Sequence, residues 1–551
     1  MTAPTATDPS AVTRVVSEPA GARLDEWRAA LALARIEGWR LLRSPAMIPG
    51  ALLLLVASSG PREVSLRSLT EQSAPPCFMV AAMTMVAVNL AVRRGARHGT
   101  AELYGSTPMS AAARTGAHLL SVAWPAMATA FVLAAQLAYW VVGRGGYGPF
   151  SLAELAVGSV LVLGAGALAV LVTRVWSSVL VVPVTCVAIA AVVLFASTPL
   201  APTSGLKHLA FWFGPVGAVL PPRPAASHLV YLLGLTALAA LTALFIDRRR
   251  PALVGLVALV LAVTVAAGVV QFDALSPSAW AAADHRLADP DDGQVCRVLH
   301  GVRYCAFPDD AGLIPQWDRA VAGVRRAVPP DRFPGDLAVT ERVSMVSLQH
   351  ATGGLRSRLA GKLPHFDNLK PIDDGRLHPS PESAWEQLSS LDLAAGTAAR
   401  TVGLPLAPRP TGTMCDPSGQ GRAVVALWLA GQSTPRARHQ LERLARKAVV
   451  ALGEHRYVIV ADTQGSTVLY GGVPWGEREV ALALALLHRS QSQVTDDVAR
   501  HWALLTDPTT STEAVAKTLG LDPGARLRAP TVELAPMTPP ADPIALSGPC
   551  P

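Results

Sequence analysis

Long apolar runs are the feature of this sequence that most restricts its fold. A helix needs about 20 apolar residues to cross the hydrocarbon core of a bilayer. We predict about seven spanning helices, at Ser44–Ser59, Pro75–Val92, His118–Val142, Leu152–Val172, Ser178–Thr198, Leu229–Ile246 and Pro251–Val270. The first run is the shortest. A further run at 208–222 is broken by Gly and Pro, and it reads equally well as an interfacial segment or as a loop.

Polar residues are distributed unevenly along the 551 residues, of which only 16% are charged. We predict a cytoplasmic N-terminus at 1–43, a membrane domain at 44–270 and a globular domain at 271–551. The net charge is +7. Because many Arg residues lie at the ends of apolar runs instead of clustering in a folded segment, they indicate membrane topology and no nucleic-acid partner.

The charge pattern also predicts orientation. The first 40 residues lack the short apolar core and cleavage site of a signal peptide, so we expect a cytoplasmic N-terminus. Seven crossings then place everything after Val270 outside the cell. Fourteen Arg residues fall in segments this scheme puts inside, including Arg248–Arg250, against five Lys or Arg residues in the short outer loops. This excess agrees with the positive-inside rule.

Four of the six cysteines lie in the region predicted to be outside: Cys296, Cys305, Cys415 and Cys550. An even number of cysteines in an oxidising compartment indicates disulfides. The stretch "CRVLHGVRYC" (296–305) reads as a hairpin closed by its own bridge, which leaves Cys415 for Cys550. Four cysteines allow three pairings, so this one is a preference. A zinc site is the alternative, although the spacing is wide and no His pair accompanies it.

The predicted spans carry no acid deep in the bilayer, which weakens a third alternative, an ion-coupled carrier, without excluding it. Ion-coupled carriers hold ionisable groups deep in the bilayer, whereas Glu154 and Asp247 lie near the ends of predicted spans. Asn89 and Gln136 lie within spans, where we expect hydrogen bonds between helices. The stretch nearest to a P-loop, "GGLRSRLAGKL" (353–363), has the wrong glycine spacing and Leu363 in place of Ser or Thr. Any motor is therefore expected in another subunit.

Two stretches resemble the ABC-2 type transporter permease family: "EGWRLLRSPAM" (37–47) and "RHGTAELYGSTPMSAAAR" (97–114). The resemblance covers roughly residues 25–246. It implies an amphipathic N-terminal helix along the inner membrane face and a coupling helix between spans two and three. It also implies a second permease subunit, of the same or a different chain, and separate ABC ATPase subunits that bind ATP and Mg²⁺. The seventh span and the outer domain are additions to the simplest family plan.

The resemblance assigns ATPase coupling to the loop between spans two and three, at Arg97, Gly99, Thr100, Glu102, Leu103, Thr107, Pro108 and Arg114. Thr100 suits a helix N-terminus, and Glu102 would lie in its first turn. Pro108 restricts the preceding residue to extended geometry. The alternative is that the loop only fixes topology.

The N-terminal segment carries part of an amphipathic pattern. Its stripe consists of Leu24, Trp27, Leu31 and Ala34, with Arg28 and Arg35 beside it. We expect this helix to lie at the membrane surface. The alternative is a cytoplasmic helix that faces solvent.

The outer domain reads as mostly helical. Helices are predicted at 312–329, 435–455, 475–490 and 494–505, with two strands around "DTQGS" within 455–474. Neither H-E-x-x-H nor G-x-S-x-G occurs, so we expect no catalysis in this domain. His488 and His501 are expected to be ordinary surface or core residues.

We therefore expect an α-helical polytopic plasma-membrane protein, with a six-span ABC-2-like unit, a seventh span and a mostly helical α+β extracytoplasmic domain. Its expected function is that of the permease subunit of an ATP-driven exporter, without enzymatic activity or a cofactor of its own. The alternative is a membrane-anchored sensor or assembly factor whose outer domain is the working part.

Overall fold

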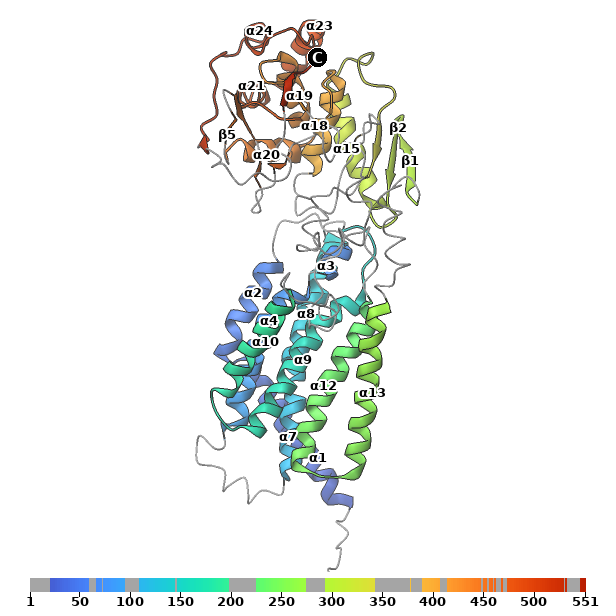
Figure 1. Cartoon of the computed structure of the whole chain (residues 1–551), viewed down its shortest axis with the longest axis vertical. Helices are drawn as coiled ribbons and strands as arrows, with labels where there is room; N and C mark the ends of the chain where they lie inside the picture. Colours follow the sequence, from blue (N-terminus) through green and yellow to red (C-terminus); the bar gives the residue numbers. More distant parts are fainter. Residues whose placement is uncertain are drawn as a thin grey trace, which may run out of the picture.

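The computed structural model shows an elongated molecule, with a helical bundle at one end and a globular C-terminal region at the other (Figure 1). It describes residues 20–58, 66–71, 73–94, 109–143, 146–197, 224–273, 293–341, 377, 389–406, 414–446, 449–452, 455–458, 460–461, 467–468, 473–529, 531–532 and 546–551. We refer to residues 293–551 as the C-terminal region.

The bundle consists of helices at all seven predicted segments. They are α2 (Ile48–Ser58), α4 (Ala74–Val92), α7 (Ala111–Ser121) continued by α8 (Ala123–Ala138) and the π-turn η2 (Tyr139–Gly143), α9 (Leu152–Val175), α10 (Val181–Ser197), α12 (Ala225–Asp247) and α13 (Pro251–Asp273). Two helices accompany them: α1 (Ala20–Leu42), joined to α2 by the 3₁₀ turn η1 (Pro45–Met47), and α3 (Leu66–Glu71).

Five of these segments are long and apolar enough to cross a membrane, namely Ala74–Val92, Ala111–Gly143, Leu152–Val175, Ala225–Asp247 and Pro251–Gln271. The pair formed by α1 and α2, bent by 54°, would make a sixth, and α10 is a shorter apolar helix. The chain thus has the helices of a membrane protein, while the predicted total of seven spans stays a prediction. The apolar run at 208–222 lies outside the described residues.

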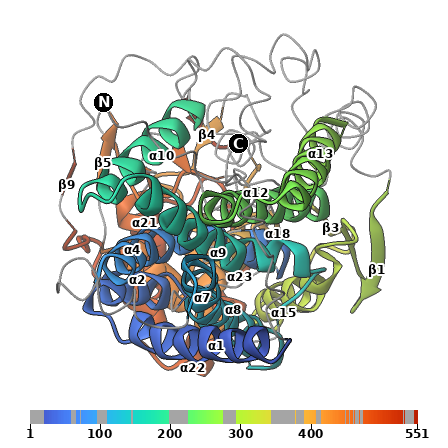
Figure 2. The ribbon, with the colours of Figure 1, turned by 90° about the horizontal axis from the view of Figure 1, so that it is seen from below.

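Helix α9 lies in the middle of the bundle and packs against α4, α8 and α12 (Figure 2). Glycines on α9 allow this close approach. A Cβ atom at Gly158 would lie 2.6 Å from Cys77 Sγ of α4, and one at Gly166 would overlap the side chain of Val122, where α7 meets α8. Small residues at such contacts are typical of helices that associate in membranes.

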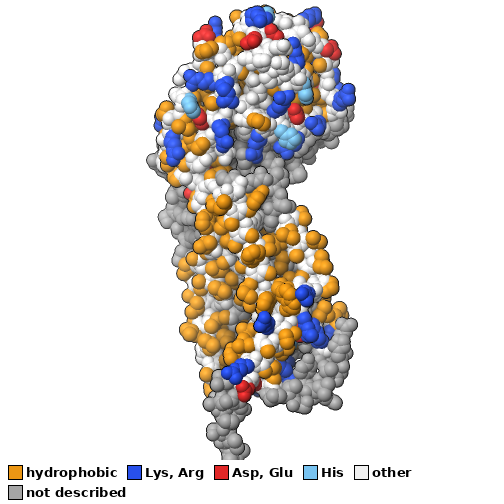
Figure 3. Space-filling model, turned by 180° about the vertical axis from the view of Figure 1, so that it is seen from behind, with side chains coloured by type: hydrophobic (Ala, Val, Ile, Leu, Met, Phe, Trp, Pro, Cys, Tyr) orange, Lys and Arg blue, Asp and Glu red, His pale blue; other side chains and the backbone are white. Residues whose placement is uncertain are grey.

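The surface of the bundle is apolar, in contrast to that of the C-terminal region. Hydrophobic side chains cover most of the visible face of the bundle, whereas Lys, Arg, Asp and Glu are scattered over the C-terminal region (Figure 3). Large apolar side chains exposed on the bundle include Phe131 of α8 and Val192 of α10. Such a continuous apolar surface would be an aggregation hazard in water and suits contact with lipid.

The C-terminal region begins with a small sheet in the order β1–β2–β3, formed by Val295–Leu299, Val302–Ala306 and Ala338–Thr340. Strands β1 and β2 form the predicted hairpin, with Cys296 opposite Cys305. Its turn places His300 at φ 48° and Gly301 at φ 79°, the positive values that a tight hairpin turn requires. The 3₁₀ turn η3 (Ala311–Leu313) and α15 (Ile314–Arg325) follow.

The main core of the C-terminal region surrounds α19 (Gly421–Ser433), which is buried almost throughout. Its neighbours are the helices α18 (Ser389–Thr401), α20 (Pro435–Leu444), α21 (Glu477–Leu487), α23 (Trp502–Leu505) and α24 (Thr512–Thr518), among others. Helix α22 (Gln491–Arg500) packs on α21 and α23.

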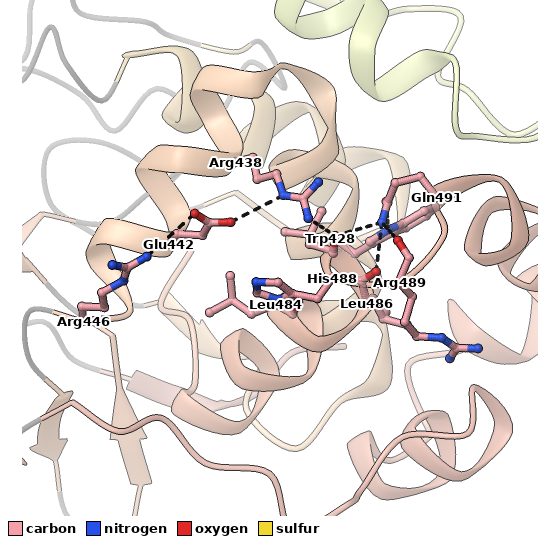
Figure 4. Close-up of polar contacts among 10 residues, drawn as sticks. Trp428, Arg438, Glu442, Arg446, Leu484, Leu486, His488, Arg489 and Gln491 are labelled. Atoms are coloured by element: carbon pink, nitrogen blue, oxygen red, sulfur yellow. Dashed lines mark hydrogen bonds and ion pairs between the residues drawn. The ribbon is translucent and has the colours of Figure 1, made fainter.

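The side chain of Gln491 forms several hydrogen bonds within this core. The indole nitrogen of Trp428 donates to Gln491 Oε1 at 3.0 Å, and Gln491 Nε2 donates to the carbonyls of Leu486, Leu487 and Arg489 (Figure 4). The amide of Gln491 thus bonds both to carbonyl groups at the end of α21 and to the indole of the buried Trp428.

The sequence prediction needs one correction here. Residues 435–455 were expected to be one helix, but α20 ends at Leu444 and Val449–Leu452 forms strand β5. The β-branched pair Val449–Val450 suits a strand, and β5 pairs with both β6 (His455–Tyr457) and β9 (Thr531–Val532). The hairpin expected around "DTQGS" is present as β7 (Val460–Ala461) and β8 (Thr467–Val468).

The remaining sheet joins distant parts of the chain. Strand β10 (Leu546–Pro549) runs parallel to β4 (Met414–Asp416). Both predicted disulfides are confirmed, with Cys296 joined to Cys305 and Cys415 joined to Cys550. Gln420 and Arg422 of the same region also donate to the carbonyl of Cys550, at 2.6 and 3.2 Å. The last described residues are therefore held covalently and by hydrogen bonds.

Candidate functional site

Helix α1 lies across the end of the bundle opposite the C-terminal region (Figures 1 and 2). We call this end, with the adjoining ends of α4, α7, α9 and α12, the α1 face. Alanines let α1 approach closely, because Ala30 and Ala34 pack against Ala117 of α7. At Gly38 a Cβ atom would overlap Trp124 of α8.

The predicted apolar stripe of α1 is divided between two environments. Trp27 and Leu31 are 55% and 46% exposed, whereas Ala34 is buried against α7. The side chain of Leu24 lies outside the described residues. The described residues of the stripe therefore do not share one environment, since the small side chain of Ala34 fits the contact with α7, and the position of this helix at the membrane surface stays a prediction. Trp39, 48% exposed, adds a second large apolar group, and the guanidinium of Arg43 lies 4.3 Å from its ring centroid.

The predicted coupling loop falls largely outside the described residues, which include neither Arg97, Gly99, Thr100, Glu102 and Leu103 nor Thr107 and Pro108. Its two ends are described, and both contact α1. Before the loop, Arg94 Nη1 donates to Glu37 Oε1 and Oε2 at 2.7 and 2.9 Å. After it, the backbone N–H of Ser110 donates to Glu26 Oε1 at 2.9 Å. Carboxylates of one helix therefore hold both ends of the loop.

Local structure explains where the chain re-enters the bundle. Ser110 is the N-cap of α7, and its hydroxyl accepts from the N–H of Ala113 at 3.2 Å. Arg114, a predicted loop residue, lies in the first turns of α7 and is half-buried. Helix α7 begins three residues after Pro108.

Asp247, the last residue of α12, connects three helices at the α1 face. Its Oδ2 accepts from Thr115 of α7 at 2.5 Å, and its Oδ1 pairs with Arg174 of α9 at 2.5 Å. The carboxylate is 10% exposed, so the pair with Arg174 is shielded from solvent on one side. The sequence placed Asp247 at the end of a span but did not reveal these partners.

A second polar contact lies deeper in the bundle. Asn89 Nδ2 of α4 donates to the carbonyl of Val179 at 3.2 Å, and its Oδ1 accepts from Thr173 of α9 at 3.1 Å. The prediction that Asn89 joins helices is confirmed. A similar pair was missed at the opposite end, where His228 Nδ1 lies 2.8 Å from Gln271 Oε1. His228 precedes the predicted start of its span by one residue, so it was not considered.

Two segments of the bundle contact the C-terminal region. Arg67 Nη1 of α3 lies 2.6 Å from Asp309 Oδ2, and Tyr147 is buried in the apolar cluster that contains Tyr304 and Trp317. The N–H of Leu66 donates to the carbonyl of Tyr147 at 2.8 Å, which ties the two segments together. We call these contacts the junction. The sequence contained no signal for it.

The described residues also bear on a metal site and on the two histidines that the sequence singled out. They contain no group of three or more His, Cys, Asp or Glu side chains placed to hold a metal ion. His488 and His501 each have Nδ1 at hydrogen-bond distance from the carbonyl four residues earlier, at 2.6 and 2.9 Å, as expected for histidines at helix ends. Comparisons of the chain with protein-family models, curated proteins and solved structures gave no match.

Proposed function

We propose that this chain is the permease subunit of an ATP-driven exporter of the ABC-2 type, and that the α1 face is the cytoplasmic surface on which a separate ATPase subunit docks. In this proposal the spans form the translocation path. The C-terminal region would lie outside the cell, where its two disulfides would be stable. A second permease subunit, of the same or a different chain, would complete the path.

The anchoring of loop 95–108 carries this proposal. Glu37 holds Arg94 and Glu26 holds Ser110, so a force applied to the loop would reach α1 at two points. A loop that only fixed topology would not need such anchors. Glu37 also pairs with Arg40 at 2.9 Å and is 5% exposed, so its carboxylate is shielded from solvent.

The same end of the bundle offers a route from α1 to the spans. Contacts of Asp247 join α12 to α7 and α9, and contacts of Asn89 join α4 to α9. Movement of α1 and the loop would therefore act on several spans together. A change between two discrete packings of these helices is the kind of transition that alternating access requires.

ATP and Mg²⁺ would bind to the partner subunit. This chain contains no P-loop sequence, and "GGLRSRLAGKL" lies far from the α1 face in sequence. The energy of ATP binding would reach the spans only through protein contacts, which makes residues of the loop the first candidates for mutation.

The alternative function, a membrane-anchored sensor or assembly factor, has one observation in its favour. The C-terminal region contacts the bundle through Arg67 and Tyr147, so a signal bound there could reach the spans. Such a protein would not need an ATPase at the α1 face.

Co-purification distinguishes the two functions. The affinity-tagged chain is isolated from its native membranes, and the bound chains are identified. The permease proposal predicts an ABC ATPase among them, and Glu102→Arg should reduce its amount while the chain stays inserted. Glu513→Arg, a charge reversal on the exposed surface of α24, is the matched control and should change nothing. If the ATPase is absent, or is retained undiminished with Glu102→Arg, the proposed docking surface is wrong.

A further inference from the structure

Helix α1 turns one side away from the bundle, and this side combines large apolar groups with arginines. Four apolar residues on it are between 46% and 55% exposed, namely Trp27, Leu31, Ile36 and Trp39. Four arginines of the same helix and its end are exposed as well: Arg28, Arg35, Arg40 and Arg43. Spacings of three, four and seven residues bring Arg35, Ile36, Trp39 and Arg43 together on one side. We call the surface formed by these eight side chains the outward side of α1.

The acids of α1 neutralise little of this positive charge. They are Asp25, Glu26 and Glu37 in the described part of the helix. Glu37 is buried, and Glu26 accepts from the backbone at the start of α7. Asp25 pairs with Arg28 at 3.5 Å, in a contact whose two side chains are 77% and 78% exposed. Among the described residues Arg35 and Arg43 have no carboxylate partner, so the outward side of α1 has a net positive charge.

Three further arginines, Arg248–Arg250, extend this basic surface from the end of α12, and all three are exposed. Asp247, directly before them, accepts from Thr115 of α7, and α7 packs along α1. Arg248 is also close enough to Glu26 of α1 for the two charges to interact. The Lys and Arg side chains visible on the bundle lie in the half that ends at the α1 face (Figure 3).

The apolar groups of the outward side continue into the surface that suits lipid. Helix α1 leads through η1 into α2, where Ile48 and Leu52 are 56% and 57% exposed. Seen along the bundle, α1 lies at its edge and not within it (Figure 2). Exposed Trp side chains are typical of the level at which lipid headgroups meet acyl chains. Arginine can cover apolar surface with its stem while its guanidinium reaches the headgroups.

We propose that the outward side of α1, together with Arg248–Arg250, binds anionic phospholipids, with the guanidinium groups on the headgroup phosphates and the Trp and Ile side chains at the acyl boundary. Guanidinium groups match phosphate oxygens with two parallel hydrogen bonds. A zwitterionic lipid offers the same phosphate beside a cationic group, so its attraction to a basic surface is weaker. This surface goes beyond the proposed transport function, and it would serve a sensor equally.

The contribution of charge sets the size of the preference. A basic residue near an anionic membrane surface strengthens binding about fivefold. Arg35 and Arg43 have no carboxylate partner among the described residues, so each should contribute in full. Raising the salt to about 0.5 M should weaken the preference, because ions screen exposed charges.

Photolabelling of the full chain in nanodiscs of phosphatidylcholine tests the proposal. Trace amounts of phosphatidylglycerol or phosphatidylcholine, each with a photoreactive group at the glycerol end of one acyl chain, are compared. Adducts are counted by mass spectrometry on peptides covering Leu31–Arg43 and, as an internal reference, on α10, which contains no basic residue. We expect at least about five times more adduct from phosphatidylglycerol on the α1 peptide, and similar amounts from both lipids on α10.

Variants assign the preference to the arginines. In Arg35→Gln/Arg43→Gln the ratio on α1 should fall at least about fivefold, whereas Arg35→Lys/Arg43→Lys keeps the charge and should keep most of it. Arg297→Gln/Arg326→Gln removes two exposed arginines of the C-terminal region and is the matched control, with an unchanged ratio. An unchanged reference on α10 shows that a variant is folded.

Three results would overturn the proposal. The first is equal labelling of α1 by the two lipids in the wild type, and the second is an unchanged ratio in Arg35→Gln/Arg43→Gln. The third is labelling of α10 but not of α1 by either lipid, which would mean that the outward side of α1 faces water or a protein. Because the nanodiscs contain this chain alone, each result is independent of whether an ATPase docks on the α1 face.

Discussion

Arg94 Nη1 lies within hydrogen-bond distance of both carboxylate oxygens of Glu37, a residue 57 positions earlier in the chain. The contact joins the end of α4 to the middle of α1 at the start of loop 95–108. The side chain of Glu37 is 6% exposed and that of Arg94 is 38% exposed. Because Arg94 is more than a third exposed, solvent screens the pair, and we expect it to contribute about 1 kcal/mol.

Substitution of Glu37 should release the loop. In Glu37→Gln the amide loses the negative charge and one of the two oxygens that accept from Arg94, and we expect the loss of about 1 kcal/mol from this contact. A spin label on Thr100→Cys should then report faster motion. Asp25→Asn is the control, because its pair with Arg28 is exposed on both sides, and it should leave the spectrum unchanged. Equal mobility with and without Glu37 would show that the contact does not restrain the loop.

The glycines of α9 should tolerate no larger side chain. Gly166→Leu forces atoms into the space of Val122 and should destabilise the bundle by about 1–3 kcal/mol or more. Gly255→Leu on α13 is the control, since nothing lies within 4 Å of a Cβ atom at that position. The measurement is the fraction of monodisperse protein after heating in detergent. Equal losses for the two variants would contradict the close packing of α9.

The polar contact at Asn89 should make a small contribution. Asn89→Leu has a similar volume but breaks the bonds to Thr173 and Val179, and interhelical hydrogen bonds in membranes average about 0.6 kcal/mol. We therefore expect a slight decrease in thermal stability. Thr242→Val serves as control, because the hydroxyl of Thr242 bonds only within its own helix, to Leu238 at 2.7 Å. A loss of several kcal/mol would reveal a role that the two bonds do not explain.

The two disulfides should differ in their effect on stability. Cys415 and Cys550 are separated by 135 residues and Cys296 and Cys305 by 9. The loop-entropy model assigns about 5 kcal/mol to the long loop and about 2.5 kcal/mol to the short one. Thermal unfolding should therefore be affected more by Cys415→Ser than by Cys296→Ser. The reverse order would mean that the short bridge restrains more than its own hairpin.

Thiol labelling also tests the predicted orientation. In intact cells an impermeant maleimide should label the C-terminal region only after treatment with an impermeant reductant. Labelling of Cys415 or Cys550 without reductant, or none after it, would contradict an external location.

Features repeated along the sequence could be predicted, whereas most contacts between distant residues could not. The bridge between Cys415 and Cys550 is an exception, because the hairpin at 296–305 left these two cysteines for each other. The apolar runs predicted the seven apolar helical segments from α2 to α13, although not the short helix α3, because a span has to be apolar wherever it lies. The buried helix α19 was missed, since "GRAVVALWLAGQS" carries no alternation of polar and apolar faces. Residues 435–455 were assigned to one helix because the pairing of β5 with β9, about 80 residues later, is not visible locally.

At the candidate site, too, the sequence predicted the location but not the contacts between distant residues. The resemblance pointed to residues 97–114, and the structure places Arg94, just before this stretch, and Ser110, near its end, on α1. The partners Glu26 and Glu37 were not predicted, since two acids on an amphipathic helix usually face solvent. The junction depends on Arg67 and Asp309, which are 242 residues apart, and single-sequence patterns contain no information on such a pair.

Site-specific photocrosslinking in native membranes tests the central claim most directly. A photoreactive amino acid is placed at Leu103 in the loop and, as control, at Val298, which is 69% exposed on β1. The account predicts an adduct between Leu103 and an ABC ATPase polypeptide, and none from Val298. If Leu103 forms no adduct with an ATPase while the chain is inserted and folded, the α1 face is not the site at which a motor docks.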